Sequence, residues 1–149
     1  MDLKEQREFS KARRGECACA NVRKAGRALT RLYDEELRPS GLRITQYGIL
    51  GVTMAMEPVT VTHLAEETVT DRTTLTRNLK ILEDRGFISI REGNDRRERE
   101  VSLTTEGREA LKAAYPFWKK AQARVMKELG DRWDSLREGL AALVDLSRE

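Results

Sequence analysis

Apolar residues at helical spacing predict a helix near the start of the chain and a second helix after it. Residues 17–38 contain four apolar positions that repeat every three or four residues, namely Val22, Ala25, Leu29 and Leu32. Pro39 is expected to end this helix. The second helix is expected to start at Thr45, whose hydroxyl can cap it, and to run to just before Pro58.

Residues 60–86 have the length and layout of a helix-turn-helix. We expect two short helices separated by a turn, with Thr70 or Asp71 as the cap of the second. One apolar face on this second helix consists of leucines spaced by four and three residues, Leu75, Leu79 and Leu82. Gly86 follows at a place where a left-handed residue often ends a helix.

A β-hairpin is expected after this glycine. Residues 87–91 are rich in strand-forming side chains, and residues 100–103 alternate polar and apolar positions beyond a polar turn. The expected tip carries Arg96, Arg97 and Arg99 around a single glutamate, so that a basic loop projects from a small sheet. A helix-turn-helix followed by such a hairpin is a winged helix, which we place at residues 45–104.

The C-terminal part of the chain is expected to be helical. A long pattern starts at residue 105, with Pro116 expected to bend it and Gly130 to end it, and a last helix carries one apolar stripe at Trp133, Leu136, Leu140 and Leu143. So short a chain leaves these stripes uncovered, which predicts that residues 17–38 and 105–149 are dimerisation helices packed across a twofold axis. The expected fold class is mainly α with a small β-hairpin wing, in a single domain over residues 1–149.

The amino-acid composition agrees with a helical protein. It does not show whether the protein binds nucleic acid, which depends on how the charges are distributed along the chain. Charged residues make up 36% of the 149 residues and aromatic residues only 5%, a balance that favours long, salt-bridged helices. The net charge of +3 is only mildly basic. Neither the apolar core of a signal peptide nor an apolar run of about 20 residues occurs. We therefore expect a cytoplasmic protein without a membrane partner.

The charge pattern of the winged helix points to DNA. An α-helix fits the major groove, where threonine and arginine side chains reach base edges and phosphates, and the narrower minor groove admits an arginine from a loop. The segment from Arg72 to Lys80 contains three cations and no carboxylate. A merely solvated helix face is the alternative interpretation of this stripe. The arginines of the hairpin, at a consistent distance downstream, favour DNA binding.

Several short motifs, taken in order, resemble the MarR family, the multiple antibiotic resistance type of transcriptional regulator. They are Leu64-Ala65, Thr74-Leu75-Thr76-Arg77, Leu82-Glu83-Asp84-Arg85-Gly86-Phe87-Ile88, Asp95-Arg96-Arg97, Val101-Ser102-Leu103-Thr104 and Gly107. The segment Leu32-Tyr33-Asp34-Glu35-Glu36-Leu37-Arg38-Pro39, followed by Gly41-Leu42, resembles the end of the family's first helix. The resemblance therefore covers nearly the whole chain.

The resemblance implies a homodimer that binds a palindromic operator in double-stranded DNA with two recognition helices and two wings. Transferred by position, the recognition-helix residues are Arg72, Thr73, Thr74, Thr76, Arg77 and Lys80. The wing residues are Asp95, Arg96, Arg97 and Arg99, with Arg97 expected to enter the minor groove. Asp95 is expected to orient a neighbouring arginine, or else to act as a plain turn former. Thr62 and His63 are candidates for a phosphate contact, although a lone histidine is weak evidence for any site.

Cys17 and Cys19 suggest a redox-sensing site. The organic hydroperoxide sensors of the family carry a reactive cysteine near the start of the first helix and a tyrosine fourteen residues later, a spacing that Cys19 and Tyr33 reproduce. Those sensors also have a tyrosine four residues after the cysteine, where this chain has Arg23, so the full sensing site is not reproduced. Two inert, reduced thiols are the alternative interpretation.

The resemblance also implies a small aromatic effector. This effector would be held between the dimerisation helices and the winged helix. Tyr33, Tyr47, Tyr115 and Trp118 are the candidate lining residues, although aromatic side chains at helical spacing are more often part of the core. No cofactor is expected. A structural zinc site needs about four ligands, and this chain offers two cysteines and one histidine, so no metal is expected.

No catalytic motif occurs in the sequence, which contains neither a glycine-rich phosphate loop nor a nucleophile elbow, and an enzyme is therefore not expected. The sequence predicts a homodimeric, DNA-binding transcriptional regulator, a repressor released from its operator by a small ligand or an oxidant. One alternative is a thiol-based redox or metal-responsive protein that acts through Cys17 and Cys19. Another is an interaction module that dimerises but no longer binds DNA.

Overall fold

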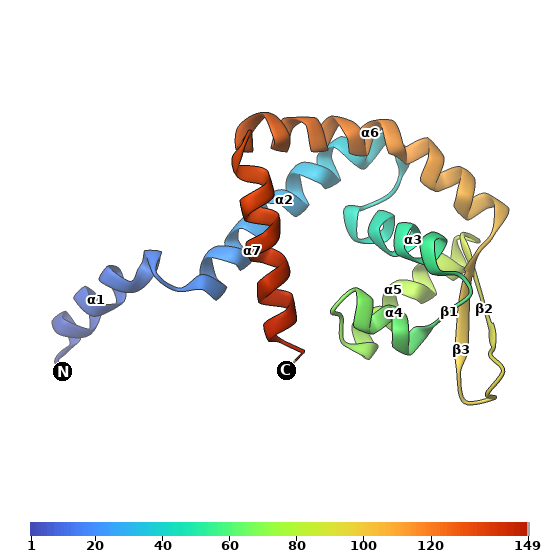
Figure 1. The fold of residues 1–149 in the computed structure, drawn as a ribbon, viewed down its shortest axis with the longest axis horizontal. Coiled ribbons are helices and arrows are strands. Elements are labelled where there is room, and N and C mark those ends of the chain that lie inside the picture. Colours follow the sequence, from blue (N-terminus) through green and yellow to red (C-terminus); the bar gives the residue numbers. More distant parts are fainter. Residues whose placement is uncertain (149) are drawn as a thin grey trace.

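The computed structural model describes residues 1–148, and most of them are helical (Figure 1). The helices are α1 (Leu3–Ala12), α2 (Ala18–Leu37), α3 (Ile44–Met56), α4 (Val61–Glu67), α5 (Arg72–Asp84), α6 (Thr105–Leu129) and α7 (Arg132–Leu146). The 3₁₀-helices η1 (Arg13–Gly15) and η2 (Arg38–Ser40) precede α2 and α3. The strands are β1 (Val59–Thr60), β2 (Ile88–Glu92) and β3 (Arg99–Leu103). The expected fold class, mainly helical with a hairpin wing, is confirmed.

Two long helices form one side of the molecule, and the winged helix lies beneath them in Figure 1. Helix α2 packs along α6, where the Tyr33 hydroxyl donates to Gln122 and the Arg124 guanidinium donates to Glu36 at 2.9 Å. Helix α3 joins α2 and α6 to the sheet. At the left of the view, α1 extends away from the rest of the chain, whereas α7 turns back from the end of α6.

The hydrophobic core lies between the helix-turn-helix, the sheet and α3. The leucine face predicted for α5 is confirmed, since Leu75, Leu79 and Leu82 are all at most 1% exposed. Gly86 directly after α5 has a φ of +76°, so the predicted left-handed residue ends this helix and lets the chain enter the hairpin.

The sheet contains one strand that the sequence analysis missed. Within the described residues its order is β1-β3-β2 and all pairs are antiparallel, with Ile88 opposite Leu103 and Glu92 opposite Arg99. The added strand β1 pairs with β3. It has only two residues, too few to show an alternating pattern. Arg99 is the first residue of β3, so it lies in the hairpin strand and not at the tip as expected.

The start of α3 corrects another expectation. Helix α3 begins at Ile44 and its N-cap is Arg43, so Thr45 lies inside the helix and does not cap it. The Gln46 side chain closes this end, because its Oε1 accepts the backbone N–H of Arg43 at 3.0 Å. The amide of a residue three positions into the helix therefore replaces the expected hydroxyl cap.

Helix α1 was not predicted from the sequence, and Leu3 and Phe9 are its only large apolar residues. Its N-terminus is closed by a capping box, in which Asp2 Oδ1 accepts the backbone N–H of Glu5 at 2.8 Å and Glu5 Oε2 accepts that of Asp2 at 2.7 Å. Leu3 and Phe9 on this helix remain exposed.

Glu57 connects the hairpin to the helices on either side. Its Oε2 accepts the backbone N–H of Leu103, the last residue of β3, at 2.7 Å, and its Oε1 pairs with the Arg108 guanidinium on α6. The carboxylate side chain is 16% exposed. The end of the wing is therefore bonded to the corner after α3 and to the first turns of α6.

Helix α6 spans Pro116 without ending there, and Figure 1 shows a bend partway along it. Proline lacks the N–H that would bond to the preceding turn, which explains a bend. Gly130, with a φ of +52°, ends the helix as predicted.

The start of α5 is fixed by Asp71, one of the two predicted caps. Its Oδ1 accepts the backbone N–H of Thr74 at 2.9 Å, and its Oδ2 accepts the Thr74 hydroxyl at 2.6 Å. The bond from the Thr74 side chain is the largest cause that lowers the pKa of Asp71 below its ordinary value. The cap therefore stabilises the fold above the ordinary aspartate pKa and is lost as pH falls through the lowered value.

Replacing Gly107 with alanine should destabilise the protein. A Cβ at this position would lie 1.9 Å from the carbonyl oxygen of Phe87, a backbone atom that cannot move aside without shifting the hairpin. We expect a loss of about 3 kcal/mol or more in the free energy of unfolding, measured by urea denaturation. The matched control is Gly48→Ala in α3, where a Cβ meets nothing within 4 Å and the helix should gain up to about 1 kcal/mol. Equal stability of the two variants would contradict this packing.

The Thr74 hydroxyl should control the titration of Asp71. In Thr74→Ala the pKa of the Asp71 carboxyl is expected to rise towards its ordinary value, whereas Thr74→Ser keeps the hydroxyl and the lowered pKa. Carbon-detected NMR titration of the aspartate carboxyls measures both. An unchanged Asp71 pKa in Thr74→Ala would rule out the side-chain bond as the main cause.

Candidate nucleic-acid interface

The polar face of α5 lies opposite its buried leucines. All six candidate recognition residues are exposed, namely Arg72, Thr73, Thr74, Thr76, Arg77 and Lys80. Because successive residues of a helix are about 100° apart, the burial of the leucine face directs these side chains to solvent. The outward face of α5 thus carries three cations and, from residue 72 to 80, no carboxylate.

A groove of about 370 Å³ connects α5 to the wing. Its lining includes Arg72, Thr76 and Lys80 from α5 and Arg99 from the first position of β3. Residues of the predicted recognition helix and the predicted wing therefore meet on one side of the molecule. The sequence analysis did not identify the apolar side chains of Val61 and Ile90, nor the carboxylate of Glu83, which also line this groove.

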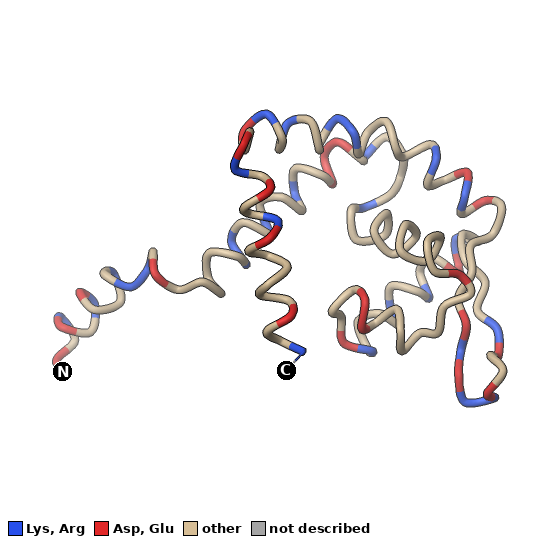
Figure 2. Tube along the Cα trace, viewed as in Figure 1, with Lys and Arg blue, Asp and Glu red and all other residues tan. Residues whose placement is uncertain are grey.

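The tip of the wing, residues 93–98, is a tight loop in which two arginines, Arg96 and Arg97, lie between two carboxylates, Asp95 and Glu98. Figure 2 shows its cations at the lower right of the view, the point of the hairpin furthest from α6. Asp95 Oδ1 accepts the backbone N–H of Arg97 at 3.0 Å, and its carbonyl accepts that of Glu98 at 2.9 Å. This is the contact of a turn former, made to the backbone of Arg97. The side chains of Arg96 and Arg97 are exposed and form no ion pair within residues 1–148.

Two of the candidate side chains on α5 have partners on the same helix or its cap. The Lys80 ammonium lies 3.0 Å from Asp84 Oδ1, and the hydrogen bond to this carboxylate raises the lysine pKa. The Thr74 hydroxyl is held by Asp71. Arg72 and Arg77, in contrast, have no carboxylate within ion-pair distance in the described part of the chain.

Thr62 and His63 lie in the first turn of α4, and both are exposed. The backbone N–H of His63 donates to the Thr60 hydroxyl at 3.1 Å, which caps the helix. The imidazole Nε2 lies 3.8 Å from Glu67 Oε1, one turn further along. A protonated histidine would therefore have a carboxylate beside it.

The candidate aromatic residues divide into two places. Trp118 stacks between Tyr47 and Tyr115, with ring centroids 6.0 and 5.9 Å apart. Tyr47 and Tyr115 also line a cavity of about 390 Å³ between α3 and α6, together with Met54, Leu111 and other residues. Burial is the main cause that raises the pKa of the Tyr47 hydroxyl. Neither Tyr33 nor Trp118 is among the residues that line this cavity. The Tyr33 hydroxyl bonds to Gln122 on α6.

The two cysteines lie at the exposed N-terminus of α2. Cys17 is the N-cap, and its Sγ accepts the backbone N–H of Ala20 at 3.4 Å. Cys19 is in the first turn and is also exposed. Fourteen helical residues separate Cys19 from Tyr33 by about 21 Å, so these two side chains do not meet within one chain.

Two other kinds of site are absent from residues 1–148. No group of three or more potential metal-ligating side chains lies together in this part of the chain. None of its helices combines the length and the apolar character needed to cross a membrane.

Comparison with known proteins relates the whole winged helix to transcriptional regulators. A sequence profile of the MarR family matches residues 40–98. The solved structure of the M. tuberculosis transcriptional regulator MosR in complex with DNA is 40% identical and has a TM-score of 0.81, covering 89% of this chain and 97% of that chain. CouR from Rhodococcus jostii RHA1, solved with p-coumaroyl-CoA, is 20% identical with a TM-score of 0.75 over 87% and 93%, and supports the fold alone.

A curated relative agrees with these structures. The uncharacterised HTH-type transcriptional regulator YwoH of Bacillus subtilis is 31% identical over 85 residues, which are 57% of this chain. The match spans 62% of YwoH, less than two thirds of that protein. The agreement with MosR over nearly the full length of both chains, together with the family profile, shows that this chain belongs to the MarR family of transcriptional regulators, and not to a family of enzymes.

Proposed function

We propose that the chain is a homodimeric, sequence-specific DNA-binding regulator, a repressor that leaves a palindromic operator when a small ligand or an oxidant acts on it. The observation that carries this proposal is the convergence of α5 and the wing on one groove, where Arg72, Thr76 and Lys80 face Arg99. Each of these residues donates hydrogen bonds of the kind that phosphates and base edges accept. The complex of its relative MosR with DNA supports the same partner for this chain.

The dimensions of the candidate interface fit duplex DNA. A helix with its side chains is about 10–12 Å across, and the major groove of B-DNA is about 12 Å wide. With α5 in the major groove, the wing tip is free to reach the neighbouring minor groove, whose negative potential attracts arginine. Arg97 is the proposed minor-groove side chain, because it is exposed at the tip and its backbone is held by Asp95.

Uncovered apolar side chains on the terminal helices support a dimer. On α7, Leu136 and Leu143 are 42% and 45% exposed, and Val22 and Leu29 on α2 are each 42% exposed. These residues have the helical spacing of packed faces, but a single chain leaves them in water. A second copy related by a twofold axis would cover both helices at once and would present two recognition helices to a palindrome.

The cavity between α3 and α6 is the proposed place for a small aromatic ligand. Its volume of about 390 Å³ lies within the usual range for ligand pockets, and apolar side chains and the Tyr47 and Tyr115 rings line it. Arg108 and Lys112 at its edge would attract an acidic group on the ligand. A ligand here would lie against Arg108, which contacts Glu57 and thereby the end of the wing.

An oxidant acting on the cysteines is a second candidate signal. Cys17 Sγ accepts a backbone N–H at the start of α2, where helix N-termini favour anions, and both thiols are exposed to solvent. A thiolate in such a position is oxidised by peroxide to a sulfenic acid. A Cys19–Tyr33 arrangement would require the tyrosine of a second copy, because about 21 Å of helix separates the two residues in one chain.

Fluorescence anisotropy of the reduced protein with its own upstream intergenic DNA, against a shuffled duplex, tests DNA recognition. We expect a preference for the native duplex of about a thousandfold or more. With six to ten phosphate contacts, affinity should fall by about 10³ to 10⁵ between 50 and 200 mM salt. Equal and weak binding to both duplexes would favour an interaction module over a regulator at this promoter.

Arg97→Ala should weaken binding to the native duplex by about tenfold or more and leave the dimer intact, because the side chain lies on an exposed loop. Size-exclusion chromatography checks the dimer, and anisotropy measures the affinity. The matched control is Arg14→Ala, an exposed arginine on η1 that is distant in sequence from the interface. Unchanged affinity in Arg97→Ala would remove the proposed role of this residue.

Peroxide should release the wild-type protein from DNA if the oxidant signal operates, whereas Cys19→Ser should stay bound. Cys17→Ser separates the contribution of the N-cap thiol, and mass spectrometry of the treated protein reports which sulfur has gained oxygen. Metal content in the purified protein, measured by elemental analysis, tests the metal-responsive alternative. Release that persists in Cys19→Ser would reject this cysteine as the sensor.

A further inference from the structure

The end of α5 is held by a guanidinium that bonds to two distant segments. Arg85, the C-cap of α5, donates through Nη1 to the Gly41 carbonyl at 3.0 Å and lies 3.4 Å from Gln46 Oε1. Its guanidinium carbon also lies 4.7 Å from the centroid of the Phe87 ring. The C-cap residue of the proposed recognition helix thus contacts the junction between α2 and α3.

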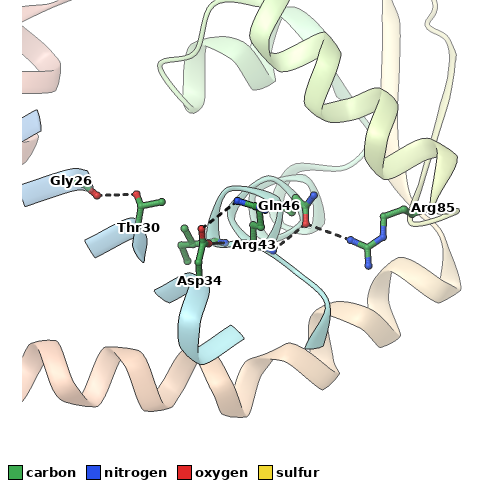
Figure 3. A network of polar contacts seen from close by, with 7 residues as sticks. Gly26, Thr30, Asp34, Arg43, Gln46 and Arg85 are labelled. Carbon is green, nitrogen blue, oxygen red and sulfur yellow. Dashed lines mark hydrogen bonds and ion pairs between the residues drawn. The ribbon is translucent and has the colours of Figure 1, made fainter. Parts of the chain in front are cut away.

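The same junction is bonded to α2 on its other side. Asp34 on α2 accepts the backbone N–H of Ile44, the first residue of α3, through Oδ1 at 2.8 Å, and its Oδ2 lies 3.9 Å from Arg43 Nη1. Gln46 Oε1 accepts the backbone N–H of Arg43 at 3.0 Å. Figure 3 shows how these side chains run from α2 across the start of α3 to Arg85. We call this set, Asp34, Gly41, Arg43, Gln46 and Arg85, the α2–α5 tie.

The geometry of the tie suits a positioning role. A guanidinium presents its donors in a rigid plane, so bonds from Nη1 together with stacking on Phe87 restrict its orientation more than one flexible ion pair would. Gly41 has a φ of +74°, and this left-handed conformation turns the chain where its carbonyl meets Arg85. Helix α5 otherwise packs mainly against α4 and β2, inside its own winged helix. The tie is therefore a polar connection that runs from α2 through the start of α3 to the end of α5.

We propose that the α2–α5 tie sets the position of the recognition helix relative to α2, and with it the half-site spacing that a dimer accepts, with Arg85 and Gln46 as positioning residues. The proposal rests on the proposed function, in which α2 belongs to the dimer contact and α5 reads DNA. Changing the distance between half-sites by one base pair moves one half-site by about 3.4 Å and about a tenth of a turn. A dimer with fixed recognition helices accepts one spacing, whereas a dimer with loosened helices accepts several.

The test measures affinity against half-site spacing. Duplexes carry the two half-sites of the protein's own operator at the native spacing, or one or two base pairs closer or further apart, and a further duplex carries a single half-site. For the wild type we expect a one-base-pair change to weaken binding by about tenfold or more. In Arg85→Ala and Gln46→Ala the same change should cost about threefold or less, while affinity for the single half-site stays within about twofold of the wild type.

Three further variants separate positioning from general damage to the fold. Arg85→Lys keeps the charge but loses the planar fork, and should give an intermediate spacing profile. The double variant Arg85→Ala/Gln46→Ala should behave like Arg85→Ala, because that substitution already removes the bond to Gln46 together with the bond to Gly41. Arg124→Ala removes an arginine bond between α6 and Glu36 on α2 without touching α5, and should keep the wild-type profile.

The outcomes distinguish the tie from the proposed function. A wild type that binds none of the duplexes rejects the proposed function. A wild type that binds with a sharp spacing preference, together with Arg85→Ala and Gln46→Ala variants that keep this preference, rejects the tie alone. An equal loss of affinity at every spacing, including the single half-site, also rejects it, because it indicates a structural role without positioning.

Discussion

The burial of three leucines on α5 determines which side chains of this helix meet solvent. Leu75, Leu79 and Leu82 are packed into the core, so α5 cannot rotate about its axis without exposing them. That single orientation places Arg72 and Thr76 beside the wing. The polar surface of the winged helix thus follows from its hydrophobic packing. The net charge of the chain is only +3, but the fold places several cations on one surface, where their combined potential is stronger than the net charge suggests.

Elements with strong local signals were predictable from the sequence. The leucine period gave α5, Asp71 gave its start, and Gly86 and Gly130 gave helix ends that the structure confirms. Elements that depend on partners distant in the chain were not. Strand β1 has two residues and exists because Val59 pairs with Val101 on β3, a contact that no local pattern encodes. Helix α1 was also missed, although its Asp2 and Glu5 capping box was a signal that could have been used.

The candidate site divides in the same way. The cations of α5 and of the hairpin could be identified from the sequence because each group lies within one short segment of the chain. The groove that joins them depends on the fold, and so does the α2–α5 tie, since Gln46 and Arg85 are 39 positions apart and only packing brings them together. The N-terminus of α3 was also mispredicted. Thr45 was the better cap by residue type, but Gln46 takes this role because its longer side chain reaches back to the backbone N–H of Arg43.

The bonds of Glu57 fix the base of the wing, and the Asp95 turn fixes the backbone of its tip. One carboxylate holds the last residue of β3 and an arginine on α6, and five cross-strand pairs continue the restraint from Ile88 to Glu92. The conformational entropy of these residues is therefore already lost when the protein folds. An encounter with a partner then needs to order only the exposed side chains at the tip, such as Arg96 and Arg97, which confines the entropic cost of association to the part of the hairpin that makes the contact.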